Sequence, residues 1–246
     1  MSEFAFVQHA ALLEQEKNRR QQVAAKLKRL RELEHNDPEF LRDSSFRDYL
    51  VSAGGLQAFL DHIRETKSHK ILDIGTGTGK ALSQIDTSRA GEGLSFVGTA
   101  LTSPKTEKPT GIQIRLTAAE SLRGIQPDSV GGVLSIESIG FSNAPELVVA
   151  NIDRTLVDGG AIKATFRKKG TYGKDWDKKY DKWDYSVHDP FTREWSKLGY
   201  DLAVAETGDD DILVAVKPGG LKPIGATELL KADIQTLPEQ IEALTS

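Results

Sequence analysis

The stretch KILDIGTGTGKAL, residues 70–82, decides how the rest of the sequence is interpreted. Apolar residues lead into Asp73, and glycine then occupies every second position, at Gly75, Gly77 and Gly79. Glycine at this density costs backbone entropy, so the chain must need a turn without side chains in the way. The pattern predicts a strand that turns tightly into a helix, and it leaves open whether a phosphate, a dinucleotide, another cofactor or nothing lies against the turn.

Short apolar runs alternate with helical segments from residue 70 onward. The runs predicted to be strands are 70–75, 94–101, 111–118, 129–138 and 161–166. This alternation implies βαβ units and a parallel sheet covered on both faces. Two further runs, 200–207 and 211–218, are too close in sequence for a parallel crossover, which predicts an antiparallel hairpin. The predicted fold class is α/β: a doubly wound Rossmann-like sheet of five parallel strands closed by an antiparallel β-hairpin, with an N-terminal helical extension.

Three helical segments complete the prediction. Residues 8–35 are rich in strong helix formers and predict one long helix, and a second helical stretch runs over residues 47–66. A third helix over residues 144–156 is predicted to end with Gly159 and Gly160 as its C-cap. We divide the chain into a helical arm over residues 1–44, one domain over residues 45–218 and a partly helical tail over residues 219–246.

The composition is that of an ordinary folded protein, with 246 residues, 38% hydrophobic residues and a formal net charge of -4. This charge argues against wholesale binding to nucleic acid or to a membrane. The absence of cysteine excludes disulfides and cysteine nucleophiles, and the scattered histidines predict no metal site. No apolar run approaches a membrane span and no signal-peptide pattern begins the chain, so we expect a cytoplasmic protein.

Two familiar glycine-rich motifs do not fit the turn. A P-loop would need glycine in place of Ile74 and a hydroxyl in place of Ala81. A dinucleotide fingerprint counted from Gly75 would need glycine in place of Lys80 and an acidic residue in place of Ala100. Each motif fails at two positions, which disfavours nucleoside triphosphate binding and an NAD-type oxidoreductase.

The pattern D-x-G-x-G-x-G after an apolar strand is matched in full. Its residues here are Asp73, Gly75, Gly77 and Gly79. With the closing hairpin beside this motif, the sequence resembles the class I S-adenosylmethionine-dependent methyltransferases over roughly residues 66–218. The resemblance implies methyl transfer with S-adenosylmethionine as cofactor. It also implies that the glycine turn, Thr76 included, lies against the methionine part of the cofactor. Asp73 would bind there by orienting the amides of this turn or by contacting the cofactor's cationic amino group.

The resemblance maps the ribose position to the end of the second strand. Relatives usually carry Asp or Glu there, whereas this sequence has Ala100. A hydrogen bond to a charged acceptor is worth roughly 1.5–3 kcal/mol, so the replacement weakens the expected binding. Thr99 or Thr102 could provide a neutral hydroxyl in its place.

The adenine position maps to the segment after the third strand. Many relatives have an acidic residue where this sequence has Ala118. Glu120 matches the acid that often follows, and the backbone around Ala119 and Glu120 is a candidate contact for adenine. The alternative is that Glu120 is only an acid at a helix N-terminus, where the helix dipole favours it.

The end of the fourth strand is the expected acceptor side. Ser135, Glu137 and Ser138 are the polar groups there. Glu137 is the candidate catalytic residue, as a general base toward an acceptor hydroxyl or amine. The alternative is a solvated residue at the end of a strand.

The segment 167–195 is the candidate substrate-selecting insertion. Its aromatic residues at helical spacing are Tyr172, Trp176, Tyr180 and Trp183. Interleaved aromatic and basic residues can stack on bases, but the same pattern is typical of an amphipathic helix packed on its own domain. His188 and Asp189, before a proline, are predicted to lie in a loop without a role.

The N-terminal helix carries seven positive charges over residues 17–31. It is a candidate contact for RNA or for an acidic protein partner, and the alternatives are a coiled-coil arm and a solvated helix. The sequence thus predicts a methyltransferase acting on a small molecule or RNA. The alternative is a non-catalytic scaffold or assembly protein that kept the fold, for which Ala100 and Ala118 are the supporting features.

Overall fold

The structure is a computed structural model, and it describes residues 17–18, 20–29, 32, 45–102, 112–168, 188–207, 210–220 and 224–244. The strands are β1 (Lys70–Ile74), β2 (Ser95–Ala100), β3 (Gln113–Leu116), β4 (Val130–Ser135), β5 (Leu156–Arg167), β6 (Asp201–Glu206) and β7 (Asp210–Val216). The α-helices are α2 (Phe46–Ala53), α3 (Gln57–Arg64), α4 (Lys80–Thr87), α5 (Pro145–Thr155), α7 (Asp189–Lys197) and α8 (Ala226–Ala243). Two short 3-10 helices are η1 (Arg89–Gly91) and η2 (Ile139–Phe141).

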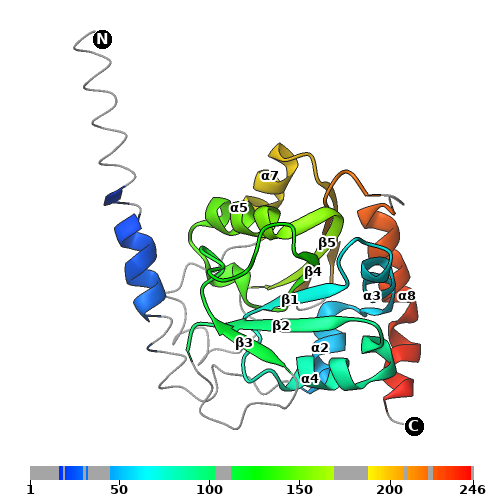
Figure 1. Cartoon of the computed structure of the whole chain (residues 1–246). Helices are drawn as coiled ribbons and strands as arrows, with labels where there is room; N and C mark the ends of the chain where they lie inside the picture. The colour runs from blue at the N-terminus through cyan, green and yellow to red at the C-terminus, as the bar shows by residue number, and fades with distance from the viewer. Residues whose placement is uncertain are drawn as a thin grey trace, which may run out of the picture.

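The strands form one seven-stranded sheet in the order β3-β2-β1-β4-β5-β7-β6 (Figure 1). All pairings among strands β1 to β5 are parallel. Strand β7 pairs antiparallel with both β5 and β6. The predicted fold class, including the closing hairpin, is confirmed. The strand order reverses at β1, which has β2 on one side and β4 on the other, and such a switch point is where α/β sheets bind ligands.

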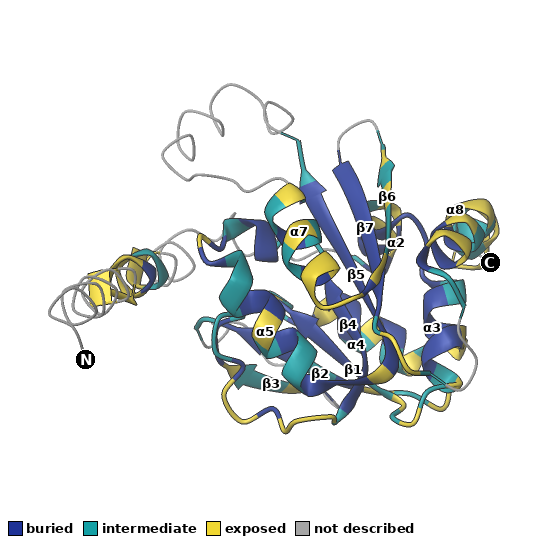
Figure 2. Ribbon diagram, turned by 90° about the horizontal axis from the view of Figure 1, so that it is seen from above, coloured by how far each residue is buried: buried dark blue, intermediate teal, exposed yellow. Residues whose placement is uncertain are grey.

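Helices cover both faces of the sheet, and each face has its own hydrophobic core (Figure 2). Helices α2, α3, α4 and α8 pack on the face that receives Ile71, whereas α5 and α7 pack on the face that receives Leu72. These two neighbours on β1 point to opposite faces because side chains alternate along a strand, and both are fully buried. The apolar runs of β1, β4, β5 and β7 therefore correspond to strands buried on both sides, whereas the edge strands β3 and β6 are partly exposed.

The predicted C-cap of α5 is wrong. Helix α5 ends at Thr155, and Leu156 is already extended and fully buried as the first residue of β5. Gly159 lies inside β5 at a φ of 73°, and a Cβ added there would come within 2.4 Å of the Cα of Gly220. This glycine therefore serves a close approach of two backbone segments, not a helix C-cap.

The helical stretch predicted before β1 is two helices. Gly54 ends α2 in the left-handed region at a φ of 65°, and Gly55 follows at a φ of 90°. The Lys163 ammonium donates to the Gly55 carbonyl at 2.6 Å and pairs with Asp233 of α8 at 2.6 Å. Asp233 Oδ1 also accepts from the backbone N–H of Ala58 in the first turn of α3 at 2.7 Å. The turn between α2 and α3 is thus fixed from β5 and α8.

The two ends of the chain differ in how they relate to the sheet. Helix α8 lies against α3 and β6, and its buried residues include Leu229 and Leu230. The described residues 17–18, 20–29 and 32 are helical, which confirms that part of the predicted N-terminal helix. Figure 1 shows this blue segment apart from the sheet.

Two predictions concern the segment before β6. The aromatic helix face predicted over residues 172–183 lies outside the described residues. His188 and Asp189 do not form a loop, because His188 is the N-cap of α7 and Asp189 is its first residue. Among the described residues, no helix has the length and apolar character needed to cross a membrane.

Candidate cofactor site

The glycine turn follows β1 at the switch point of the sheet. Gly75, Gly77 and Gly79 have φ angles of 77°, 57° and 82°. Residues other than glycine rarely adopt this left-handed backbone conformation. The backbone N–H groups of Gly75 and Thr76 donate to the carbonyl of Thr99 on β2, at 3.1 and 2.9 Å. The turn is therefore fastened to the neighbouring strand before it enters α4 at Gly79.

Close packing holds the turn from two sides. A Cβ added at Gly75 would lie 2.4 Å from the Cβ of Ser138, which follows β4. A Cβ added at Gly98 on β2 would lie 2.5 Å from Cγ2 of Thr76. The sequence does not predict this role of Gly98, because a lone glycine inside a strand does not indicate which residue packs against it.

Asp73 is the buried acid of the site, with 2% of its surface exposed. The hydroxyl of Tyr49 on α2 donates to its Oδ1 at 2.8 Å. Burial raises the pKa of the Asp73 carboxyl to about 6, and the hydroxyls of Thr76 and Tyr49 oppose this rise. The pKa of Tyr49 is raised by burial and by the negative charge of Asp73, so its phenol stays neutral and donates.

Ser135 and Ser138 join the end of β4 to the turn. Ser135 is fully buried, and its Oγ lies 2.7 Å from Oγ of Ser138 and accepts from the N–H of Ile139 at 3.2 Å. The Ser138 hydroxyl donates to the carbonyl of Ile74. Both serines therefore support the local backbone in the described structure, and the predicted cofactor contact of Ser135 stays a prediction.

Glu137 has a left-handed backbone at a φ of 54°, which costs about 1–3 kcal/mol for a residue other than glycine. Its N–H donates to the hydroxyl of Thr165 on β5 at 3.0 Å. Its carboxylate pairs with Arg167 at 2.7 Å and accepts from the hydroxyl of Ser52 on α2 at 3.2 Å. Arg167 also pairs with Asp210 at 3.0 Å. Glu137 is thus a fixed, ion-paired carboxylate and not a freely solvated residue at a strand end.

The end of β2 offers no acidic group. Thr99 is 1% exposed, and its hydroxyl lies against the turn, accepting weakly from the N–H of Gly75 at 3.4 Å. Ala100 is 3% exposed, and its carbonyl accepts from the N–H of Thr117 at 3.0 Å. The predicted ribose position therefore presents only a methyl group in the described structure.

Glu120 lies in the segment after β3, next to Ala119. The hydroxyl of Ser142 donates to its Oε1 at 2.6 Å. The side chain of Asn151 on α5 donates to its backbone carbonyl at 2.9 Å. Glu120 thus connects the segment after β3 to Ser142, before α5, and to Asn151 within α5, and its contact with adenine stays a prediction.

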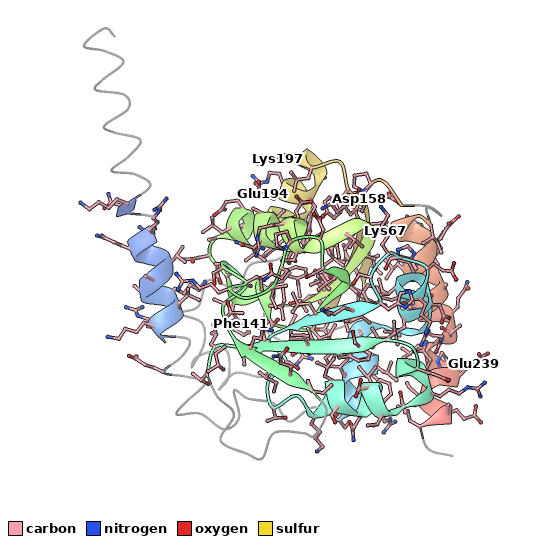
Figure 3. The ribbon with its side chains drawn as sticks, viewed as in Figure 1. Lys67, Phe141, Asp158, Glu194, Lys197 and Glu239 are labelled. Atoms are coloured by element: carbon pink, nitrogen blue, oxygen red, sulfur yellow. The ribbon has the colours of Figure 1, made fainter. Side chains whose placement is uncertain are left out.

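These residues share one edge of the sheet because β1, β2, β3 and β4 are parallel neighbours. In Figure 3, Lys67 before β1 and Phe141 after β4 label opposite edges, and the site lies at the edge of Phe141. Register pairs Ile74 with Thr99, and Ala100 with Leu116. A separate groove of about 640 Å³ between α3, η1 and α8 contains none of the predicted site residues.

Comparison with known proteins identifies the class of fold. No family model matches the sequence, and no curated protein sequence matches it. The [4+2]-cyclase SpnF aligns with a TM-score of 0.51 at 14% identity, over 65% of this chain and 80% of SpnF. Geranyl diphosphate methyltransferase in complex with SAM also aligns with a TM-score of 0.51 at 14% identity, over 65% of this chain and 84% of that one.

A third solved structure is an O-methyltransferase family protein from Burkholderia thailandensis. It aligns with a TM-score of 0.51 at 12% identity, over 67% of this chain and 57% of that chain. The chain therefore has the fold of the class I S-adenosylmethionine-dependent methyltransferases, as the sequence predicted. At these low sequence identities, the similarity supports the fold alone.

Proposed function

We propose that this protein binds S-adenosylmethionine at the C-terminal ends of β1 and β4 and transfers its methyl group to an acceptor. One observation carries the proposal: a buried, hydrogen-bonded Asp73 stands directly before three glycines with left-handed φ angles at the switch point of the sheet. Geranyl diphosphate methyltransferase, which has this fold, is described in complex with SAM.

The residues present fit the methionine part of the cofactor. Asp73 would face its ammonium group, and the glycine turn would lie along its chain without a Cβ in the way. The N-terminus of α4 suits its carboxylate, because backbone N–H groups and the helix dipole favour an anion there. The ribose end lacks the usual carboxylate at Ala100, so the adenosine would rest on the backbone near Ala119 and Glu120.

Bound S-adenosylmethionine supplies a methyl group on a positively charged sulfur. The protein contributes orientation, which can lower a barrier by about 7–11 kcal/mol when two reactants are held in line. Glu137 is the proposed proton acceptor for the acceptor's hydroxyl or amine, held in place by Arg167 and Thr165. The acceptor class proposed from the sequence, a small molecule or RNA, is unchanged.

The basic N-terminal helix is the proposed contact for RNA or for an acidic protein partner. Lys28 and Arg29 are exposed, and the helical segment stands on the same side as the C-terminal strand ends (Figure 1). A cationic helix in this place would attract an anionic acceptor toward the site.

The second candidate is a non-catalytic protein with the methyltransferase fold, acting as a scaffold or in assembly. Ala100 and Ala118 support it, because both are buried and neither provides an acid for ribose or adenine. The fold by itself does not imply methyl transfer, because SpnF, which aligns with this chain, is described as a cyclase. Cofactor binding and turnover therefore need separate measurements.

Calorimetric titration with S-adenosylmethionine and S-adenosylhomocysteine, with NAD as a control ligand, tests the proposal. We expect micromolar binding that is lost in Asp73→Ala and Gly77→Val. Asp153→Ala is the matched control for the first, since Asp153 also accepts from a tyrosine hydroxyl, that of Tyr200, at 2.9 Å. Gly199→Val is the control for the second, because Gly199 has a φ of 78° and open space around its Cβ position.

Two results would contradict the proposal. The first is an absence of binding to the unaltered protein at millimolar ligand. The second is an equal loss of binding in the site variants and their controls. The first result would favour the scaffold candidate and direct attention to protein or RNA partners. The second would mean that the variants lose binding through a general effect on the fold, so that Asp73 and the glycine turn are not the binding site.

A further inference from the structure

Helix α2 reaches the candidate site through two hydroxyl groups. Tyr49 donates to Oδ1 of Asp73 at 2.8 Å, and Ser52 donates to Oε1 of Glu137 at 3.2 Å. Tyr49 and Ser52 are three residues apart in sequence, so they lie on one face of the helix. This single face of α2 therefore spans the ends of β1 and β4.

Both ends of α2 are fixed. Ser45 and Asp48 form a capping box at its start, and Gly54 ends it in a left-handed conformation. The next carbonyl, that of Gly55, accepts from the buried ammonium of Lys163. The Tyr49 hydroxyl is therefore placed by a helix anchored at both ends rather than by a loop.

The hydrogen bond between Tyr49 and Asp73 has a defined direction. Tyr49 is 7% exposed, and a phenol beside a carboxylate keeps its proton and donates it. A donor toward a buried carboxylate stabilises its charged form and fixes its orientation, whereas burial alone disfavours the charge. Together with the hydroxyl of Thr76, this hydroxyl thus favours the charged form of the acid that precedes the glycine turn, and it fixes the direction of the carboxylate.

We propose that Tyr49 is a positioning residue of the cofactor site, whose hydroxyl holds the Asp73 carboxylate charged and oriented for the ammonium group of S-adenosylmethionine. This rests on the proposed function, since it requires that S-adenosyl compounds bind at this edge of the sheet. Tyr49 acts through Asp73 and does not itself react. Tyr49 is not part of the glycine-rich sequence motif, because it lies on a helix before β1.

The test compares two ligands that differ in the group that Asp73 would recognise. S-adenosylhomocysteine carries the ammonium group, and 5′-methylthioadenosine lacks the entire amino acid part. Tyr49→Phe keeps the ring and removes the hydroxyl. We expect binding of S-adenosylhomocysteine to weaken about tenfold, as for the loss of a hydrogen bond to a charged group. Binding of 5′-methylthioadenosine should change by less than about twofold, because it has no group for Asp73.

Tyr200→Phe is the matched control. Tyr200 is 6% exposed and donates to a carboxylate, that of Asp153, at 2.9 Å, between α5 and the start of β6. Its variant loses the same kind of hydrogen bond away from the site. We expect it to lower stability without changing the ratio of the two ligand affinities.

A second variant separates positioning from folding. Asp73→Asn should lose the preference for S-adenosylhomocysteine, and adding Tyr49→Phe to it should weaken that ligand no further. Equal losses for both ligands in Tyr49→Phe, no loss, or tighter binding of S-adenosylhomocysteine would each overturn the role of Tyr49. Failure of the unaltered protein to bind either ligand would instead overturn the proposed function, and with it this inference.

Discussion

Lys163 on β5 and Asp233 on α8 form an ion pair, with 2.6 Å between Nζ and Oδ2, in which neither side chain is exposed to solvent. Lys163 also donates to the carbonyl of Gly55 in the turn that joins α2 to α3, and Asp233 accepts from the N–H of Ala58 in the first turn of α3. Burial lowers the pKa of Lys163, and the charge of Asp233 opposes this change. Each buried charge is compensated only while its partner is present.

Removing one member of this pair should therefore destabilise the fold. Asp233→Ala leaves a buried ammonium without its partner, and we expect a loss of about 3–5 kcal/mol in the free energy of unfolding. Denaturation with urea measures it. The double variant Lys163→Met with Asp233→Leu should be more stable than Asp233→Ala, because no charge stays buried. A single variant as stable as the unaltered protein would contradict this account of the pair.

Asp73 should lower the stability of the protein at neutral pH. Its pKa is about 6 in the folded protein against 3.8 for the unperturbed group, so the folded state binds the proton more tightly. The cost of ionisation is absent below the lower value, grows as the pH rises between the two, and is complete above the higher one. The difference corresponds to about 3 kcal/mol.

Asp73→Asn removes this cost, so it should raise the stability at neutral pH while removing the preference for S-adenosylhomocysteine over 5′-methylthioadenosine. The gain in stability should shrink as the pH falls through the range between the two pKa values. Urea denaturation across a pH series checks this, with Asp153→Asn as a control on an acid outside the site. A variant less stable than the unaltered protein at every pH would refute the prediction.

Gly98→Ala should disturb the glycine turn from the neighbouring strand. The added methyl would lie 2.5 Å from Cγ2 of Thr76, so the turn must shift. We expect a loss of about 1–3 kcal/mol in stability together with weaker cofactor binding. Thr76→Ser removes the clashing Cγ2 and should restore part of both losses when combined with Gly98→Ala. Thermal unfolding and calorimetry measure them, and a double variant no better than Gly98→Ala would show that the contact is not the cause.

Ala100→Asp tests whether the cofactor's ribose lies at the end of β2. A carboxylate there should strengthen binding of S-adenosylmethionine roughly tenfold, since it adds a charged acceptor. The variant should also be less stable without ligand, because position 100 is 3% exposed. Ala100→Asn has the same shape without the charge and should give the smaller gain. Equal affinity in both variants and the unaltered protein would place the ribose elsewhere.

The sheet was predictable because its signals are local. Apolar runs of strand length, and the short connection before Asp210 and Asp211, are visible in the sequence itself and fix the strands and the closing hairpin. The glycine turn was visible for the same reason, since left-handed positions select glycine. Gly159 was misassigned because its requirement comes from Gly220, distant in sequence.

The site was less predictable than the fold, since several of its contacts join distant segments. Tyr49 and Ser52 act on Asp73 and Glu137 across intervals of 24 and 85 residues, and no motif links them. The pairing of Glu137 with Arg167 likewise depends on how β4 lies beside β5. Sequence patterns placed the acids at the correct edge, whereas their partners emerged only from packing.

The position of Asp233 also bears on the order in which the protein is made and folds. The N-terminus of α3 and the ammonium of Lys163 both depend on Asp233, a residue of α8 that follows all seven strands of the sheet in the sequence. A nascent chain that has emerged only as far as β7 lacks Asp233, so the sheet cannot reach its final stability on the ribosome before α8 is complete. Folding of the sheet and its helices should therefore be completed only after α8 has been synthesised, and ribosome-bound chains truncated before Asp233 should be readily cleaved by proteases.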